Sequence, residues 1–237
     1  MQQIDVQNAV GRTTYPGRGI VLGMSEDGAH AVIGYFIMGR SVNSRNRVFV
    51  ADGDGLRTQA HDPAKVADPS LIIYAPVRVA GKHTVVTNGD QTDTICEHLN
   101  AGSDFAAALR ARTFEPDAPN FTPRVSGMVT LCGAKARFDM AILKSDMGDS
   151  ARCLRQFFEY EAMYPGEGRF LHTYQGDGEP LPSFEGEPEP VSLRGGIDQV
   201  TGDIWNGLNA DNRVSLFVRF IRLSDGAHED RIVNRHA

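Results

Sequence analysis

The chain has 237 residues, of which 41% are hydrophobic and 23% are charged, and its formal net charge is −6 at pH 7. This composition is typical of a folded protein with a sizeable core, and the length suits one large domain or two small ones. The negative charge argues against a nucleic-acid-binding protein, which normally carries a basic domain or stripe. The apolar runs are too short for a membrane span.

The N-terminus and the cysteines indicate where in the cell the protein is expected. The first five residues lack the charged and apolar regions of a signal peptide. Cys96, Cys132 and Cys153 are odd in number and widely spaced, which favours reduced thiols over a disulfide framework. We therefore expect a soluble, cytoplasmic protein that binds neither nucleic acid nor membranes.

The first half of the chain reads mainly as strands. Residues 18–38 have the pattern of a β-hairpin, and Val48 to Val50 form a third strand. A second hairpin is expected from the runs 70–79 and 83–87. The polar turn that follows feeds a helix, which Thr92 or Asp93 can cap and which Gly102 divides into two pieces.

The second half continues with strands, a long loop and one weak helix. Residues 151–161 fit either a helix or a strand, and we favour a strand. The remaining expectations are strands over 125–131, 136–143, 169–174 and 214–223, a surface loop over 176–190 and a helix over 197–208. Grouped helices and many strands predict one α+β domain over residues 1–237, with mostly antiparallel sheets.

One segment places several arginines at the end of an apolar run. The run from Tyr35 stops at Gly39, and Arg40, Arg45 and Arg47 follow among serines and asparagines. Arginine is suited to bidentate recognition of phosphate or carboxylate, which predicts an anion-binding loop. A solvated turn with scattered charge explains the same residues. Arg45 has no role that the sequence suggests, and we expect it to face water.

Two further segments carry polar side chains in positions that can hold a ligand. Residues 88–94 join a strand to a helix start, where free N–H groups attract anions. Taken alone, this string is better explained by capping and turn chemistry, which account for Asn88-Gly89 and Asp93 without a ligand. In the proline-rich loop 113–124, Glu115 lies between Phe114 and Pro116, and partial desolvation there would suit it to proton transfer. An ordinary exposed charge is the alternative.

Several standard signatures are absent from the sequence. It contains no P-loop, dinucleotide fingerprint, nucleophile elbow or zinc-ligand spacing. The stretch Asp52-Gly53-Asp54-Gly55 resembles the start of a calcium loop, but Pro63 occupies the position of the closing glutamate, so a turn is expected. We expect neither a metal nor a cofactor.

Taken together, the three segments resemble the IMP cyclohydrolases of the archaeal (PurO-like) type. The resemblance covers about half of the chain and is most specific over residues 88–94; the arginine loop is a little longer than the family pattern, and the region after Pro180 is only weakly similar. The matching motifs are Tyr15-Pro16-Gly17-Arg18, Gly39-Arg40-Ser41, Asn46-Arg47, Tyr74, Arg78, Val85-Val86, Asn88-Gly89, Thr92-Asp93-Thr94, Glu115, Asn120, Thr122-Pro123-Arg124, Thr173-Tyr174 and Glu179-Pro180.

The resemblance implies a fold, a reaction and partners. The implied fold is a four-layer αββα sandwich of antiparallel sheets, like that of N-terminal-nucleophile hydrolases, without a processed N-terminal nucleophile. The implied reaction closes the ring of 5-formamidoimidazole-4-carboxamide ribotide (FAICAR), giving IMP and water in purine synthesis. The expected partners are this small purine ribotide and further copies of the chain in a homo-oligomer.

By the same resemblance, Arg47, Tyr74 and Glu115 are the catalytic residues. Arg47 and Tyr74 would polarise the formyl oxygen, and Glu115 would move the proton. The substrate-binding candidates are Arg18, Arg40 and Arg124 for the 5′-phosphate, and Asn88 and Asp93 for the purine precursor or ribose.

Two other functions remain open at this point. The first is a non-catalytic purine-nucleotide-binding or regulatory protein on the same scaffold, which would need the arginines but not Glu115. The second is an amide hydrolase with a true N-terminal nucleophile, which an intact N-terminus seen by mass spectrometry would exclude.

Overall fold

The computed structural model describes residues 3–65 and 73–236, which form two seven-stranded sheets and a few short helices. The first sheet has the order β1 (Ile4–Asp5), β12 (Glu189–Ser192), β11 (Glu167–His172), β2 (Arg18–Met24), β3 (His30–Met38), β13 (Arg213–Arg222) and β14 (His228–Asn234). The second has the order β10 (Asp149–Tyr160), β9 (Lys135–Asp146), β8 (Arg124–Cys132), β7 (His83–Thr87), β6 (Val77–Ala80), β5 (Gly55–Ala60) and β4 (Arg47–Asp52).

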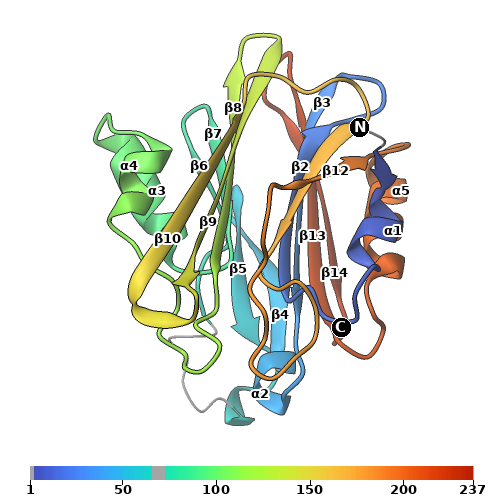
Figure 1. Cartoon of the computed structure of the whole chain (residues 1–237). Helices are drawn as coiled ribbons and strands as arrows, with labels where there is room; N and C mark the ends of the chain where they lie inside the picture. Colours follow the sequence, from blue (N-terminus) through green and yellow to red (C-terminus); the bar gives the residue numbers. More distant parts are fainter. Residues whose placement is uncertain (1–2, 66–72, 237) are drawn as a thin grey trace.

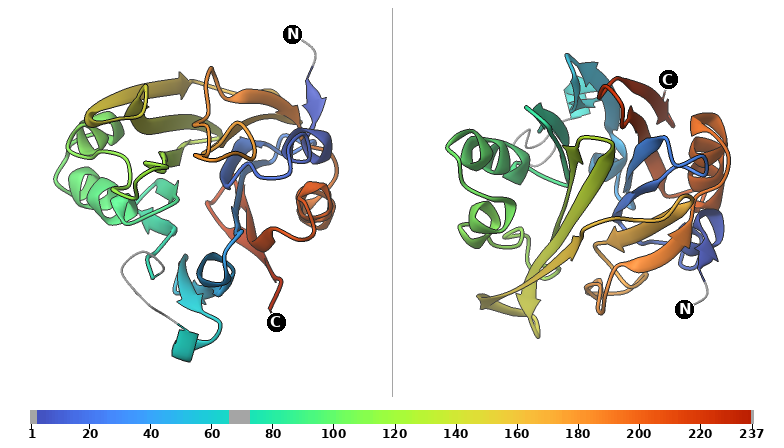
Figure 2. Two further views of the ribbon diagram at one scale, coloured as in Figure 1. Left: turned by 60° about the horizontal axis from the view of Figure 1, so that its bottom comes forward. Right: turned by 90° about the horizontal axis from the view of Figure 1, so that it is seen from above.

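The two sheets lie face to face, with helices on their outer sides (Figures 1 and 2). Helices α3 (Gln91–Asn100) and α4 (Phe105–Arg110) cover the second sheet. Helices α1 (Val6–Val10) and α5 (Ile197–Gly207) cover the first. The short α2 (Val42–Arg45) and a 3₁₀ turn (Pro63–Lys65) lie at one end of the molecule (Figure 1).

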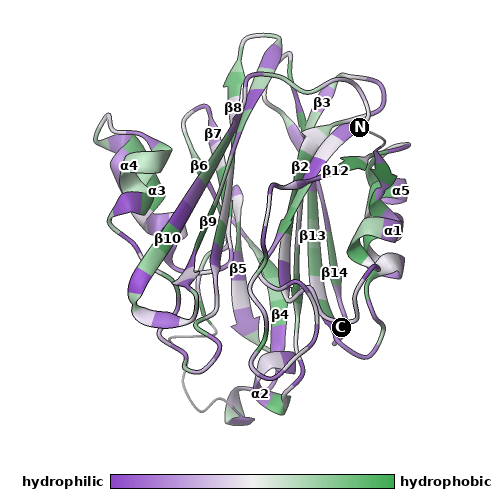
Figure 3. Cartoon of the chain, viewed as in Figure 1, coloured by the Kyte–Doolittle hydropathy of each residue, from purple (hydrophilic) through white to green (hydrophobic). Residues whose placement is uncertain are grey.

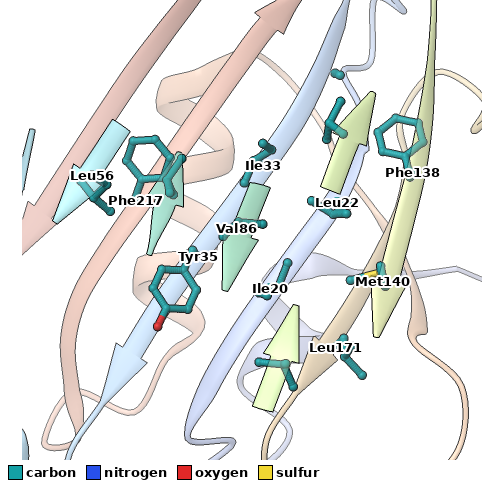
Figure 4. Close-up of a cluster of buried hydrophobic side chains, with 14 of the residues drawn as sticks. Ile20, Leu22, Ile33, Tyr35, Leu56, Val86, Phe138, Met140, Leu171 and Phe217 are labelled. Atoms are coloured by element: carbon teal, nitrogen blue, oxygen red, sulfur yellow. The ribbon is translucent and has the colours of Figure 1, made fainter. Parts of the chain in front are cut away.

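The main core fills the space between the sheets. Ile20, Leu22 and Ile33 of the first sheet pack with Val86 and Phe138 of the second, and all five are fully buried (Figure 4). Burying one such side chain fully contributes ~1.5–3 kcal/mol relative to exposure. The hydropathy of the strands follows this burial, since β2 and β13 are largely hydrophobic whereas the edge strand β10 carries many hydrophilic residues (Figure 3).

The side chains of β9 alternate between the two faces of the second sheet, so this strand contributes to two apolar layers. Phe138, Met140 and Ile142 belong to the core between the sheets, whereas Ala141 and Leu143 pack with α3 and α4. Successive side chains of a strand point to opposite faces, so a sheet covered on both faces needs apolar residues at consecutive positions.

Much of the expected element order is confirmed. Strands β2 and β3 form the hairpin over 18–38, β4 contains the strand over 48–50, and β10 resolves the ambiguity over 151–161 as a strand. Gly102, with a φ of 78°, separates α3 from α4 as expected. The mostly-β α+β class is also confirmed, and the stretch 52–55 is a turn between β4 and β5.

Other expectations were wrong or incomplete. The N-cap of α3 is Asp90, because the Thr92 hydroxyl turns inward to the Gly89 carbonyl at 3.0 Å and Asp93 lies within the first turn. The sheets are not purely antiparallel, since β1 and β12 pair in parallel. In the run 70–79, only 77–79 belong to a described strand, and residues 70–72 lie outside the described part. The elements that sequence reasoning did not expect are β1, β5, β12, β14, α1 and α2.

Candidate active site

A cavity of about 310 Å³ opens where the start of β2, the loop after β3 and the loop 115–122 meet. Arg18, Arg40 and Arg47 line it, together with Tyr15 and Tyr174. Three guanidinium groups therefore gather in one cavity of a chain whose net charge is −6.

Arg18 joins the cavity to Glu115. The Arg18 Nη1 lies 3.2 Å from Glu115 Oε1 and 3.3 Å from Oε2, and Glu115 is 8% exposed. Burial opposes the charge of Arg18, but the Glu115 carboxylate, followed by Tyr74, Tyr174 and Tyr35, raises the Arg18 pKa well above its usual value. The guanidinium therefore stays charged and holds the carboxylate in place.

The loop that carries Glu115 is fixed by hydrogen bonds across it. The Glu115 N–H donates to the Thr122 carbonyl at 2.9 Å, and the Thr122 N–H donates to Asp117 Oδ1 at 2.6 Å. The Thr122 hydroxyl lies 2.6 Å from the Tyr174 hydroxyl, whose pKa burial raises to about 12. These contacts hold the Glu115 backbone in one position, as a proton-transferring group requires.

Tyr74 is held by β5 and paired with a second tyrosine. Its N–H donates to the Thr58 hydroxyl at 2.9 Å, and its carbonyl accepts from the Thr58 N–H at 2.9 Å. The hydroxyls of Tyr74 and Tyr35 are 2.7 Å apart, and the Tyr35 ring is fully buried against Phe49. Burial and the neighbouring Tyr74 raise the pKa of Tyr35 well above its usual value, so Tyr35 keeps its proton.

Arg47 is the most deeply buried arginine of the cavity, at 3% exposed. Its Nε donates to the Ser44 carbonyl at 2.9 Å and its Nη2 to the Met38 carbonyl at 3.3 Å. Within residues 3–65 and 73–236, no carboxylate forms an ion pair with it. Burial, and then the charge of Arg18, lowers its pKa, which means that an anion or a polarised oxygen would relieve an uncompensated charge.

Arg40 lies at the rim of the cavity. Its Nη1 forms an ion pair with Asp177 and donates to the Gly178 carbonyl at 3.3 Å, and its guanidinium lies 5.1 Å from the centre of the Tyr15 ring. The hydroxyls of Ser41 and Ser44, which form the capping box of α2, line the same cavity.

Five sequence-predicted site residues lie outside the lining of this cavity, and three of them, Asn88, Asp93 and Arg124, also make no contact with the residues that line it. Arg124 Nη1 bonds Asp90 Oδ1 at 2.8 Å and Gln91 Oε1 at 2.7 Å. Asp93 is exposed and bonds Arg78 at 2.7 Å. All three contacts join the first turn of α3 to neighbouring strands.

Asn88 is buried, at 1% exposed, and all its contacts are internal. Its Oδ1 accepts from the Val125 N–H at 2.9 Å and from the Gln91 Nε2 at 3.0 Å, while its Nδ2 donates to the Pro123 carbonyl at 2.9 Å. The amide therefore ties the turn after β7 to the start of β8.

The structure thus brings together five of the eight candidates. Arg18, Arg40 and Arg47 line the cavity, and Glu115 contacts Arg18. Tyr74 contributes an upward shift to the pKa of both Arg18 and Arg47.

Two corrections concern residues outside the candidate set. Arg45 does not simply face water, because its Nε donates to the Gly39 carbonyl at 2.9 Å and its Nη2 to Asn212 Oδ1 at 3.1 Å. Sequence reasoning did not single out Tyr35, whose hydroxyl contacts Tyr74; the available signal was a tyrosine within an otherwise apolar strand.

The chain was compared with models of known protein families. A family model described as IMP cyclohydrolase-like protein matches residues 15–227. The chain belongs to the IMP cyclohydrolase-like family. The match spans all eight candidate residues, and it confirms the family resemblance expected from the sequence.

Relatives within this family carry the name IMP cyclohydrolase. One from Methanothrix thermoacetophila is 29% identical over 159 residues, covering 64% of this chain and 77% of the relative. Another from Methanopyrus kandleri is 34% identical over 116 residues, covering 47% of this chain and 57% of the relative. A third, from Methanocella arvoryzae, is 31% identical over 120 residues, covering 49% of this chain and 58% of the relative.

None of the helices in the described ranges combines the length and apolar character that a bilayer span requires.

Proposed function

We propose that this IMP cyclohydrolase-like protein closes the ring of FAICAR to give IMP and water. The observation that carries the proposal is the buried Arg47, which no carboxylate of the described residues neutralises, beside the Arg18–Glu115 pair. The family match and the names of the relatives support the same reaction.

The reaction needs an oxygen to be polarised and protons to be moved. The carboxamide nitrogen attacks the formyl carbon, forming the new C–N bond, and the formyl oxygen gains negative charge. The C–O bond then breaks, and the oxygen leaves as water with one proton from the carboxamide nitrogen and one from the formamido nitrogen. Both reacting groups belong to one substrate, so the enzyme mainly orients them and stabilises charge.

The roles follow from the contacts. Arg47 and the Tyr74 hydroxyl donate to the formyl oxygen, where removal of one such donor costs ~3 kcal/mol, or about a hundredfold in rate. Glu115 accepts a proton from the attacking nitrogen and returns it to the departing oxygen. Arg18 orients Glu115 through their ion pair, a different task from the phosphate contact expected from the sequence.

The 5′-phosphate is assigned to the rim. Arg40 exchanges Asp177 for the phosphate, and the Ser41 and Ser44 hydroxyls donate beside it. Asn88, Asp93 and Arg124 are assigned a structural role, because their side chains join the turn at the start of α3 to the neighbouring strands β6 and β8 and contact none of the residues that line the cavity.

We also propose that the fold is the four-layer αββα sandwich of N-terminal-nucleophile hydrolases. The proposal is supported by two facing sheets with α3 and α4 on one outer side and α1 and α5 on the other.

Three substitutions test the proposed site: Arg47→Ala, Tyr74→Phe and Glu115→Gln, assayed for IMP formation from FAICAR. We expect kcat to fall by about a hundredfold or more for each, since each removes a group acting on the reacting atoms. Glu161→Gln, on the surface, is the matched control and retains turnover. Near wild-type kcat in all three variants would refute these roles, and tight IMP binding without turnover would favour the regulatory alternative.

A further inference from the structure

A second cavity, of about 600 Å³, lies beside the first and shares Asn120 and Leu181 with it. The Leu181 N–H donates to Asn120 Oδ1 at 3.0 Å, which closes the wall between the two cavities. The proposed ring closure uses no residue from the other side of this wall.

The second cavity contains a buried lysine. Lys144, on β9, is 8% exposed and donates from Nζ to the Phe184 carbonyl at 2.6 Å. Among the described residues no carboxylate forms an ion pair with it. A lysine is rarely buried without such a partner. The other lysines of the chain, Lys65, Lys82 and Lys135, are exposed.

The surroundings of Lys144 make its amine easier to deprotonate than that of an exposed lysine. Burial lowers its pKa, and the charge of Glu185 opposes this shift only in part. The other carboxylate of the cavity, Asp146, lies 3.3 Å from Arg152. A neutral lysine has a free lone pair and acts as a nucleophile towards carbonyl groups.

We propose that Lys144 captures small aldehydes or ketones in this second cavity as an imine. The nitrogen lone pair attacks the carbonyl carbon, a C–N bond forms, and the C–O bond breaks. The carbonyl oxygen leaves as water with the two protons of the amine, so no oxidant or reductant is needed. The amine gives up its hydrogen bond to the Phe184 carbonyl when it reacts.

The walls define the kind of carbonyl compound. Pro119, Pro180 and Leu154 present apolar surface, and Ser145 and Gln175 supply polar groups. This mixture suits a compound with an apolar body and few polar atoms. The carboxylates of Asp146 and Glu185 disfavour a strongly anionic one.

Reductive trapping tests the proposal on the intact protein. Folded protein is treated near neutral pH with benzaldehyde and cyanoborohydride, and peptide mapping by mass spectrometry follows each lysine with time. We expect Lys144 to be benzylated several-fold faster than Lys82 and Lys135, since its amine loses its proton more readily and lies in a cavity that can hold the aldehyde. In denaturant the four lysines should react at similar rates.

Matched variants locate the reaction. Lys144→Arg keeps a donor for the Phe184 carbonyl but removes the nucleophile, so fast labelling disappears, whereas Lys82→Met leaves it unchanged. The proposal is overturned if the exposed lysines react first in the folded wild-type protein, or if Lys144 reacts no faster than they do. The wild-type map decides this even if a variant does not fold.

Discussion

At the scale of single residues, the Tyr35 hydroxyl connects the core strand β3 to the proposed site. It lies 2.7 Å from the Tyr74 hydroxyl, and its own pKa is raised so that it remains a donor. When Tyr35 donates to the Tyr74 oxygen, the Tyr74 proton is left to point elsewhere. Tyr35 is therefore a positioning residue for the proposed donor.

Replacing Tyr35 by Phe tests this role. The ring keeps its stacking on Phe49, and one hydrogen bond worth ~1 kcal/mol is lost. We expect kcat for IMP formation to fall about threefold to tenfold with little change in KM, measured by steady-state kinetics. Tyr164→Phe, at an exposed position, is the control. An unchanged kcat in Tyr35→Phe would contradict the positioning role.

Asp139 is a buried carboxyl group whose charge is poorly compensated. It is 3% exposed, and its Oδ2 lies 3.4 Å from Arg137 Nε without a well-aligned hydrogen bond. Burial raises its pKa, so ionisation is harder in the folded than in the unfolded chain. Folding stability is therefore lost as pH rises through the unfolded pKa towards the folded pKa, and the full cost applies above the folded pKa.

We expect Asp139→Asn to raise the free energy of unfolding at pH 7, since it removes a buried carboxylate whose ionisation the fold opposes. The gain should shrink as the pH approaches the usual Asp pKa of about 3.9. Urea denaturation at several pH values measures it, with the exposed Asp54→Asn as control. A gain that does not depend on pH would contradict the explanation.

At the scale of elements, the residues of the turn between β7 and α3 can be tested for a structural against a substrate-binding role. Asn88 makes three hydrogen bonds there, to Val125, Gln91 and Pro123. Asn88→Ala leaves these buried groups without partners, each at a cost of ~1–3 kcal/mol. We expect the free energy of unfolding in urea to fall by at least ~2 kcal/mol, with the KM for FAICAR within about twofold of wild type.

Asp93→Ala is the companion variant, because the Asp93 side chain is exposed and bonds only Arg78 among the described residues. It should change neither stability nor KM appreciably. A large rise in KM for either variant, with stability retained, would return these residues to the substrate site.

The long, strongly patterned elements were predictable, and the elements that depend on pairing were not. The apolar run over 18–38 can only be buried, so β2 and β3 followed from the sequence. Strand β14 has the sequence His228-Glu229-Asp230-Arg231-Ile232-Val233-Asn234 and shows little apolar pattern. It forms because it pairs with β13, where Asp230 binds the buried Arg219 at 2.7 and 2.8 Å.

The same distinction applies to the site. Residue type and local context pointed to Arg47 and Glu115, since clustered arginines and a proline-flanked carboxylate have local signatures. The Arg18–Glu115 pair joins residues 97 positions apart, and local sequence does not encode such a contact. The internal bonding of Asn88 likewise depends on β8, more than thirty residues away.

At the scale of the whole molecule, the site exists because the two sheets pack together. Arg18 and Tyr35 come from β2 and β3 of the first sheet, whereas Arg47 begins β4 of the second and Tyr74 is held by β5. The core between the sheets therefore sets the distances among the proposed catalytic groups. The homo-oligomer expected from the family resemblance stays a prediction, which sedimentation of the purified protein tests.

The central claim is that this chain closes the FAICAR ring at the cluster around Arg47. The most direct measurement adds FAICAR to the purified protein and follows IMP formation by absorbance, with Glu115→Gln run beside it. We expect the wild-type protein to form IMP at a rate proportional to its concentration, and the variant to form little. Tight binding of IMP with no conversion of FAICAR by the wild-type protein would contradict it.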